Sequence, residues 1–312
     1  MPRATRHGSV HAQWTDPLSL WAHYRPGRSL PAVIALVTAT SAAHLDTDLA
    51  YLTAALADSG IEHRVEAWDD PSVDWSVFDM VIVRSTWDYH RRLTEFLTWV
   101  DAVDTVTTLA NPAAMMRSNV DKRYLTHLAN DGVPVVPTLV ITSVDEFHDV
   151  DFGGDIVVKP AVGAGANGAR RIIDDPATAR AHALELLGGS AVVVQPYLTD
   201  VDTSGEVGIV FIDGALSHAF NKAALLRGDV SWADGLYAEE EITPRVPTRD
   251  EVALATDVAG RFDGALYLRV DMLPSATGPV ISEVEAVEPS LFCHIDPVSA
   301  NRFATAVRRR VG

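Results

Sequence analysis

Three carboxylates lie on two segments near the C-terminus that are typical of β-strands. Asp271 stands in "YLRVDML", and Glu283 and Glu285 stand in "ISEVEAVEP". Side chains alternate between the two faces of a strand, so Arg269 and Asp271 share one face, as do Glu283 and Glu285. Acids that converge on adjacent strands repel one another unless a cation lies between them. Hard oxygen ligands suit Mg²⁺, so the pattern favours a magnesium site over a solvated strand face.

A glycine-rich segment, "VVKPAVGAGANGARRI" at residues 157–172, suggests contacts with phosphate groups. Gly163, Gly165 and Gly168 fit the dinucleotide fingerprint G-x-G-x-x-G, but that fingerprint opens a helix whose N-terminus binds the pyrophosphate. Here the loop runs into "ARRII", which is typical of a strand, and no strand-terminal acid follows about 20 residues on to bind a ribose. We therefore expect a flexible hairpin whose backbone N–H groups lie over phosphates, with Lys159 at its stem. A simple turn without a ligand is the alternative.

The first elements along the chain predict an α/β domain over residues 32–111. Strand patterns in "AVIALVT", "HRVEAW" and "FDMVIVR" alternate with helical patterns in "HLDTDLAYLTAALADSG" and "RRLTEFLTWVDAV". This alternation indicates a doubly wound parallel sheet with helical crossovers. Residues 1–31 lack the apolar stretch of a signal peptide, and we expect a poorly ordered extension.

Two α+β lobes are expected after residue 111, over residues 112–196 and 197–312. In the first lobe, Ser118 is a candidate N-cap for a helix ending at Gly132, and "SVDE" at 143–146 is a candidate capping box. In the second lobe, a hairpin turning at Asp213-Gly214 precedes a helix opened by the capping box "TRDE" at 248–251. Two more strands and a terminal helix complete it.

Composition excludes several classes of partner. The net charge is −17, which argues against nucleic acid, because nucleic-acid binding needs a positive surface. No apolar run approaches the length of about 20 residues that crosses a membrane. A single cysteine, Cys293, excludes an intramolecular disulfide and is typical of a reducing compartment, so we expect a cytoplasmic protein.

The order and spacing of these motifs resemble those of ATP-grasp ligases over residues 32–310. The resemblance implies an N-terminal doubly wound domain followed by two lobes that hold ATP between them, with Mg²⁺ as a second cofactor. It matches Asp271, Glu283 and Glu285 to the metal ligands, although many members have asparagine where Glu285 stands. The residues implied to bind nucleotide are Lys122, Lys159, Gly163, Gly165, Gly168, Gln195, Tyr197, Leu198 and Glu206.

The chemistry implied by the resemblance is formation of a C–N bond through an acylphosphate. Lys222 and Arg269 are implied to face the transferring phosphate and stabilise developing negative charge. "VRSTWDYH", "GALSHAFNK" and "EVEAVEPSLF" more narrowly resemble a bacterial subgroup described as glutathione-synthetase-like or RimK-like. It includes enzymes of antibiotic biosynthesis that close O-ureido-D-serine into a ring. A ligase joining two amino acids, a hydroxyl phosphotransferase and a nucleotide-binding module without turnover are the alternatives.

Substrate contacts are expected at "RSTWDYH", which follows a strand of the predicted parallel sheet. Open α/β sheets bind their ligands beyond the carboxyl ends of the strands. Arg84 is therefore a candidate to pair with a substrate carboxylate, and Ser85, Thr86 and Asp88 are candidates for polar contacts. The alternative is an ion pair of Arg84 within the fold. The expected partner is one small amino-acid-like substrate, and a homo-oligomer is compatible with the sequence.

Overall fold

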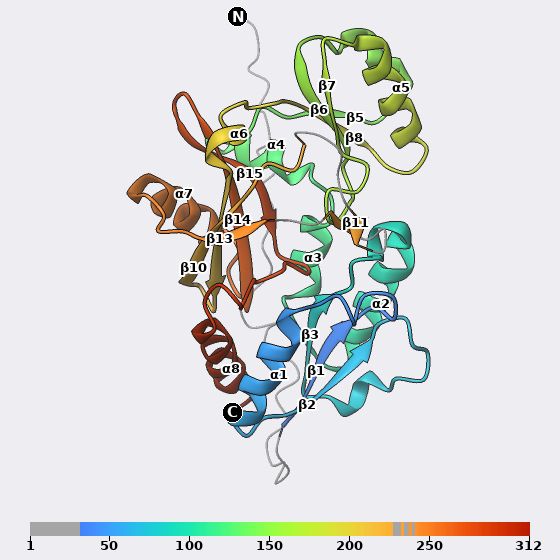
Figure 1. The fold of residues 1–312 in the computed structure, drawn as a ribbon. Helices are drawn as coiled ribbons and strands as arrows, with labels where there is room; N and C mark the ends of the chain where they lie inside the picture. The colour runs from blue at the N-terminus through green and yellow to red at the C-terminus, as the bar shows by residue number, and fades with distance from the viewer. Residues whose placement is uncertain (1–31, 227–231, 234–236, 239–240) are drawn as a thin grey trace, which may run out of the picture.

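A computed structural model describes residues 32–226, 232–233, 237–238 and 241–312, and the extension at residues 1–31 lies outside this range. Figure 1 shows a parallel sheet at the bottom, a large antiparallel sheet in the middle and a small antiparallel sheet at the top. Within the described chain, no helix is long and apolar enough to span a bilayer.

The N-terminal sheet has four parallel strands in the order β2-β1-β3-β4. Its strands are β1 (Val33–Thr38), β2 (Glu62–Ala67), β3 (Met80–Ser85) and β4 (Thr108–Ala110), with α1 (Asp48–Asp58) and α2 (Leu93–Val106) as crossover helices. Strand β3 is buried along its whole length and β1 along nearly all of it, as expected for parallel strands covered on both faces. The predicted doubly wound domain is confirmed.

The small sheet at the top of Figure 1 belongs to the central lobe of the chain and is called the central sheet below. It is antiparallel, in the order β5-β8-β6-β7. Its strands are β5 (Leu139–Ile141), β6 (Asp155–Pro160), β7 (Arg170–Ile173) and β8 (Val192–Pro196), and the helices of this part of the chain are α3 (Ala113–Asn119), α4 (Tyr124–Asn130) and α5 (Pro176–Leu187). The glycine-rich segment joins β6 to β7 and opens no helix. The dinucleotide-type reading is therefore excluded, as the sequence predicted.

Two capping predictions in this region are wrong. Ser118 lies inside α3, where its hydroxyl donates to the Met115 carbonyl at 2.8 Å. The expected helix is split because the side chain of Asn119 binds the backbone of β15 and the N–H of Lys122 binds the Ala161 carbonyl. At "SVDE" a short 3₁₀ helix (Val144–Asp149) forms, but Glu146 accepts hydrogen bonds from Thr142.

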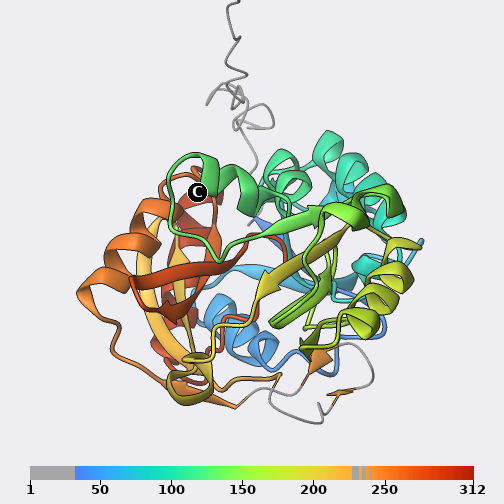
Figure 2. The ribbon, with the colours of Figure 1, turned by 90° about the horizontal axis from the view of Figure 1, so that it is seen from above.

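The C-terminal sheet has the order β13-β10-β9-β14-β15, and all of its pairings are antiparallel. Its strands are β9 (Glu206–Ile212), β10 (Ala215–Lys222), β13 (Ile242–Pro244), β14 (Tyr267–Ser275) and β15 (Gly278–Glu285), accompanied by α6 (Val201–Ser204), α7 (Arg249–Ala259), α8 (Val298–Val311) and a small ribbon of β11 (Trp232–Ala233) and β12 (Tyr237–Ala238). The turn at Asp213-Gly214 and the capping box at Thr248 and Glu251 are confirmed. Figure 2 shows α5 and α7 on opposite outer sides of the two antiparallel sheets.

The C-terminal helix α8 packs against α1 of the N-terminal sheet (Figure 1). Leu52 and Leu56 of α1 share a buried cluster with Phe303 and Val307 of α8, and Val210 of β9 joins the same cluster. The core therefore runs across the two ends of the chain and fixes the N-terminal sheet against the C-terminal sheet.

Asp48 links α1 to the loop that follows β15. Its carboxylate accepts the backbone N–H groups of Leu291 (2.6 Å), Phe292 (3.1 Å) and Cys293 (2.7 Å). Just before α1, Asp46 accepts the N–H of Asp48 at 2.9 Å. The buried Asp48 thus satisfies three backbone donors of a loop more than 240 residues away.

Replacing Asp48 should destabilise the fold. We expect Asp48→Asn to lower the free energy of unfolding by about 1–3 kcal/mol, because an amide replaces one acceptor oxygen and removes the charge that strengthens these hydrogen bonds. Chemical denaturation monitored by circular dichroism measures the change. Asp58→Asn, at the exposed end of the same helix, is the matched control and should leave stability unchanged or slightly higher. Equal stability of the two variants would contradict this role of Asp48.

Candidate functional site

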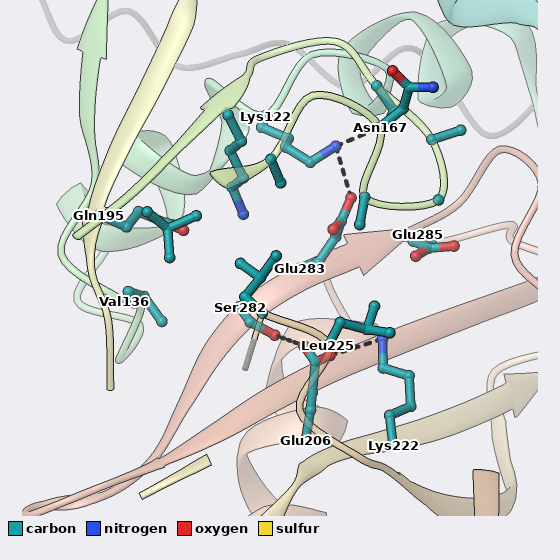
Figure 3. Close-up of a pocket in the computed structure, with 18 of the residues that line it drawn as sticks. Lys122, Val136, Asn167, Gln195, Glu206, Lys222, Leu225, Ser282, Glu283 and Glu285 are labelled. Carbon is teal, nitrogen blue, oxygen red and sulfur yellow. Dashed lines mark hydrogen bonds and ion pairs between the residues drawn. The ribbon is translucent and has the colours of Figure 1, made fainter. Parts of the chain in front are cut away.

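A cavity of about 260 Å³ lies between the central and C-terminal sheets, beside the segment that follows β3. Lys159 and Gln195 line it from the central sheet, and Lys222 and Glu283 line it from the C-terminal sheet. Trp87 extends the wall from the N-terminal domain. Figure 3 shows labelled side chains from both antiparallel sheets directed into this space. The cavity therefore collects polar groups from all three parts of the chain.

The chain contains three lysines, and all three line this cavity. The ammonium group of Lys122 lies 2.9 Å from Glu283 and donates to the Gly163 carbonyl at 3.0 Å. Lys222 bridges Glu206 at 2.8 Å and Asp271 at 2.9 Å. Lysine ammonium groups are compact point charges suited to phosphate oxygens. Such a concentration of lysine indicates a site for a multiply charged anion.

Lys159 differs from the other two lysines because no described carboxylate lies within ion-pair distance of it. Burial lowers the pKa of its ammonium group, and the neighbouring cations Lys122 and Lys222 add to this effect, while Glu283 opposes it. An anion bound beside Lys159 would offset the cost of burying its positive charge. Of the three cations, Lys159 is thus the one most available to a ligand.

The acids converge as predicted. The β14–β15 register places Asp271 opposite Glu283 and Arg269 opposite Glu285. Arg269 donates to Asp271 at 2.9 Å and also pairs with Glu285. Burial alone would raise the pKa of Asp271, but Arg269 and Lys222 outweigh it and lower that pKa. Cations thus hold the converging carboxylates together.

The negative charge of Glu285 is not fully compensated by its neighbours. Burial raises the pKa of its carboxyl to about 8; Arg269 opposes this, and the charges of Glu283 and Asp271 add to it. The described residues contain no ready-made cluster of three or more metal-binding side chains, because the acids are paired with lysine and arginine. Their oxygen donors and the surplus of negative charge nevertheless fit a divalent cation such as Mg²⁺, which would relieve the repulsion.

The glycines of the β6–β7 loop have different roles. Gly163 and Gly165 line the cavity, whereas Gly168 does not. Gly168 has φ +77°, and a Cβ there would lie 3.2 Å from Pro160 and 3.3 Å from Leu186. Only glycine tolerates this conformation and this close packing. We therefore assign Gly168 to closing the stem of the loop, which corrects its predicted place among the ligand contacts.

The other residues predicted to bind nucleotide also line the cavity. Gln195, Tyr197, Leu198 and Glu206 all line it. Gln195 donates to the Thr138 hydroxyl at 2.8 Å, and this bond leaves the carbonyl oxygen of its side chain as an acceptor. The Tyr197 hydroxyl donates to Asp202 at 2.5 Å. The side chains of Gln195 and Tyr197 are thus held in place by hydrogen bonds within the fold.

The four predicted substrate contacts do not line the cavity. Arg84 is 1% exposed, donates to the Pro289 carbonyl at 2.8 Å and lies 3.8 Å from Asp48. This is the ion pair that the sequence left as the alternative. Ser85 donates to Thr38, Asp88 accepts from Trp68, and Thr86 is fully buried. These four side chains are therefore buried within the fold at the end of β3. The alternate residues Trp87 and Tyr89 line the cavity instead.

Other polar residues line the cavity without having been assigned a role from the sequence, among them Ser282, Glu288 and Ser290. Ser282 stands beside Glu283, so strict alternation would place it on the opposite face. A β-bulge in the pairing of β15 with β14 at this point changes that, and the Ser282 hydroxyl hydrogen-bonds to Glu206. Glu288 and Ser290 were detectable only as polar residues in the segment "EVEAVEPSLF".

Comparisons with known proteins identify relatives of the chain. The profile of the D-cycloserine synthetase DcsG N-terminal domain matches residues 34–111. The cycloserine biosynthesis protein DcsG of Streptomyces lavendulae is 35% identical over 308 residues, covering 89% of this chain and 99% of that protein. The crystal structure of D-cycloserine synthetase DcsG superposes with a TM-score of 0.80 at 34% identity, over 90% of this chain and 100% of that one.

A more distant structure shows the wider fold. The structure of the ATP-grasp ligase PsnB with a minimal precursor gives a TM-score of 0.60 at 20% identity, over 90% of this chain and 100% of that chain. At this identity the likeness concerns the fold alone. Together with the relative that is 35% identical over nearly its whole length, it confirms the ATP-grasp assignment made from the sequence. The chain is an ATP-dependent ligase and belongs to the DcsG family of ATP-grasp enzymes.

Proposed function

We propose that the chain closes O-ureido-D-serine into the ring of D-cycloserine at the expense of ATP. The observation that carries the proposal is the gathering of all three lysines beside the converging acids in one cavity. The 35% identity to the cycloserine biosynthesis protein DcsG supports the choice of substrate. In this proposal, ATP occupies the cavity between the two antiparallel sheets, with its phosphates under the β6–β7 loop and its base beside Gln195.

In the first step, a substrate carboxylate oxygen attacks the γ-phosphorus, and the bond from that phosphorus to ADP breaks. Lys159 and Lys122 neutralise the phosphates, and Lys222 and Arg269 stabilise charge that develops on the transferring group. Asp271, Glu283 and Glu285 would hold Mg²⁺, which supplies further neutralisation of phosphate charge when bound. The product of this step is an acylphosphate.

In the second step, a nitrogen of the same molecule attacks the acyl carbon and displaces phosphate. Ring closure within one molecule benefits from proximity, with effective molarities that reach about 10⁵ M or more. Because cycloserine carries no carbamoyl group, the overall conversion also requires hydrolysis of the bond between the ring nitrogen and the carbamoyl carbon, which consumes one water and releases CO₂ and NH₃. Trp87 and Tyr89 line the cavity and would limit the access of bulk water to the acylphosphate.

The identity of the product tests the proposal directly. The purified chain, incubated with O-ureido-D-serine, ATP and MgCl₂, should form cycloserine and ADP with a single amino-acid substrate present, as detected by mass spectrometry. ADP formation that requires two amino acids, together with a dipeptide-type product, would instead establish intermolecular ligation. Phosphate transfer to a hydroxyl would establish the phosphotransferase alternative.

Lys159 should be needed for nucleotide affinity. We expect Lys159→Met to raise the Kd for ATP about 10- to 100-fold, because it removes a charge-assisted contact worth about 1.5–3 kcal/mol. Isothermal titration calorimetry measures the affinity. Arg170→Met removes an exposed positive charge from the same hairpin and should leave the Kd within about twofold of the wild-type value. An unchanged ATP affinity in Lys159→Met would rule out this phosphate contact.

Glu283 should matter for the rate more than for the fold. We expect Glu283→Gln to lower kcat at least about 100-fold, because an amide is a poor ligand for the magnesium that supports phosphoryl transfer. The measurement is steady-state ADP release at several magnesium concentrations, with circular dichroism as the check on folding. Glu62→Gln, on the exposed side of β2, is the control. A near-normal kcat at limiting magnesium would place the metal elsewhere.

A further inference from the structure

Glu288 is a buried acid in the cavity, and no other described residue pairs with its carboxylate. It is 8% exposed and lines the cavity wall. Glu206, Glu283 and Glu285 each pair with a lysine or an arginine. The Glu288 carboxylate, by contrast, forms no ion pair or hydrogen bond with another residue in the part of the chain that the structure describes. Burying a carboxylate without a partner is costly, so its presence in the cavity wall points to a ligand.

The backbone around Glu288 is held in place by side chains from other elements. Trp87 donates to the Glu288 carbonyl at 3.4 Å, Arg84 to the Pro289 carbonyl at 2.8 Å, and Tyr267 to the Val287 carbonyl at 2.9 Å. Three successive carbonyl groups are therefore fixed. A carboxylate on so rigid a segment has a defined position before any ligand arrives, which is what selective recognition requires.

Two aromatic residues accompany this acid in the cavity wall. Trp87 and Tyr89 line the same cavity from the segment after β3. Burial raises the pKa of the Tyr89 hydroxyl well above its ordinary value, and the nearby charge of Glu288 is the next contribution. Aromatic faces and a carboxylate both attract a cation, and their combination favours an organic ammonium group. A strongly hydrated metal ion prefers the several acids of β14 and β15 instead.

We propose that Glu288, together with Trp87 and Tyr89, forms the subsite that binds the ammonium group of the amino-acid substrate. The inference rests on the proposed function for the identity of that substrate. Binding of the ammonium group at Glu288 would anchor one end of the substrate. Its carboxylate could then face Arg269, which lines the same cavity. The subsite would thereby select amino acids over simple carboxylic acids.

The test compares two ligands on matched variants. In the presence of magnesium and the ATP analogue AMP-PNP, calorimetry measures the Kd of O-ureido-D-serine and of its analogue with hydrogen in place of the amino group. We expect Glu288→Gln to weaken binding of the amino compound about 10- to 100-fold. It should bind the deamino analogue and AMP-PNP as wild type does. Glu288→Asp should bind the amino compound more tightly than Glu288→Gln, and Glu62→Gln should match wild type.

Three results would overturn the inference. Equal affinity of wild type and Glu288→Gln for the amino compound would show that Glu288 does not bind the ammonium group. Equal weakening for both ligands would show that Glu288 acts through another part of the substrate. A changed magnesium requirement with unchanged substrate affinity would make Glu288 a metal ligand. Failure of the wild-type protein to bind O-ureido-D-serine at all would instead refute the proposed substrate.

Discussion

The arrangement of the candidate site is constrained by the balance of charge in one buried cavity. Five acids and four cations meet in or beside this cavity, and the acids alone would repel one another strongly in a medium of low polarity. Arg269 and Lys222 offset the charge of Asp271, and Lys122 offsets that of Glu283. Glu285 stays incompletely compensated, since its pKa is raised to about 8 by burial first and then by neighbouring acids. Such a site is poised to exchange its internal ion pairs for contacts with a charged ligand.

The fold holds this cavity from three directions. The antiparallel pairing of β14 with β15 sets the acids opposite one another, and β6 brings Lys159 from the other sheet. The N-terminal domain is tied in by Asp48, which accepts three N–H groups of the loop after β15. This loop follows directly from β15, which carries Glu283 and Glu285. The packing of α1 against α8 therefore helps to fix the position of these two acids.

Local sequence patterns predicted much of the fold, and the family resemblance added most of the candidate site residues. Alternating strand and helix signals predicted the parallel sheet, and strand alternation predicted that the acids converge. Lys159 was proposed from its place before the glycine loop, whereas Lys122 and Lys222 were implied only by the family resemblance. The errors arose where contacts across the fold decide. Ser118 lost its capping role because Asn119 binds β15, and Arg84 turned inward because Asp48 and the Pro289 carbonyl lie next to it. Ser282 enters the cavity through a β-bulge, which no periodicity predicts.

The most direct measurement is a crystal structure of the chain with Mg–AMP-PNP. We expect the triphosphate beside Lys159 and Lys122, under the loop that contains Gly163 and Gly165, with the base next to Gln195. We further expect magnesium bound by Asp271, Glu283 and Glu285, with the ammonium groups of Lys122 and Lys222 shifted from these acids to the phosphates. A nucleotide bound outside this cavity, or phosphates out of reach of all three lysines, would contradict the proposed nucleotide site.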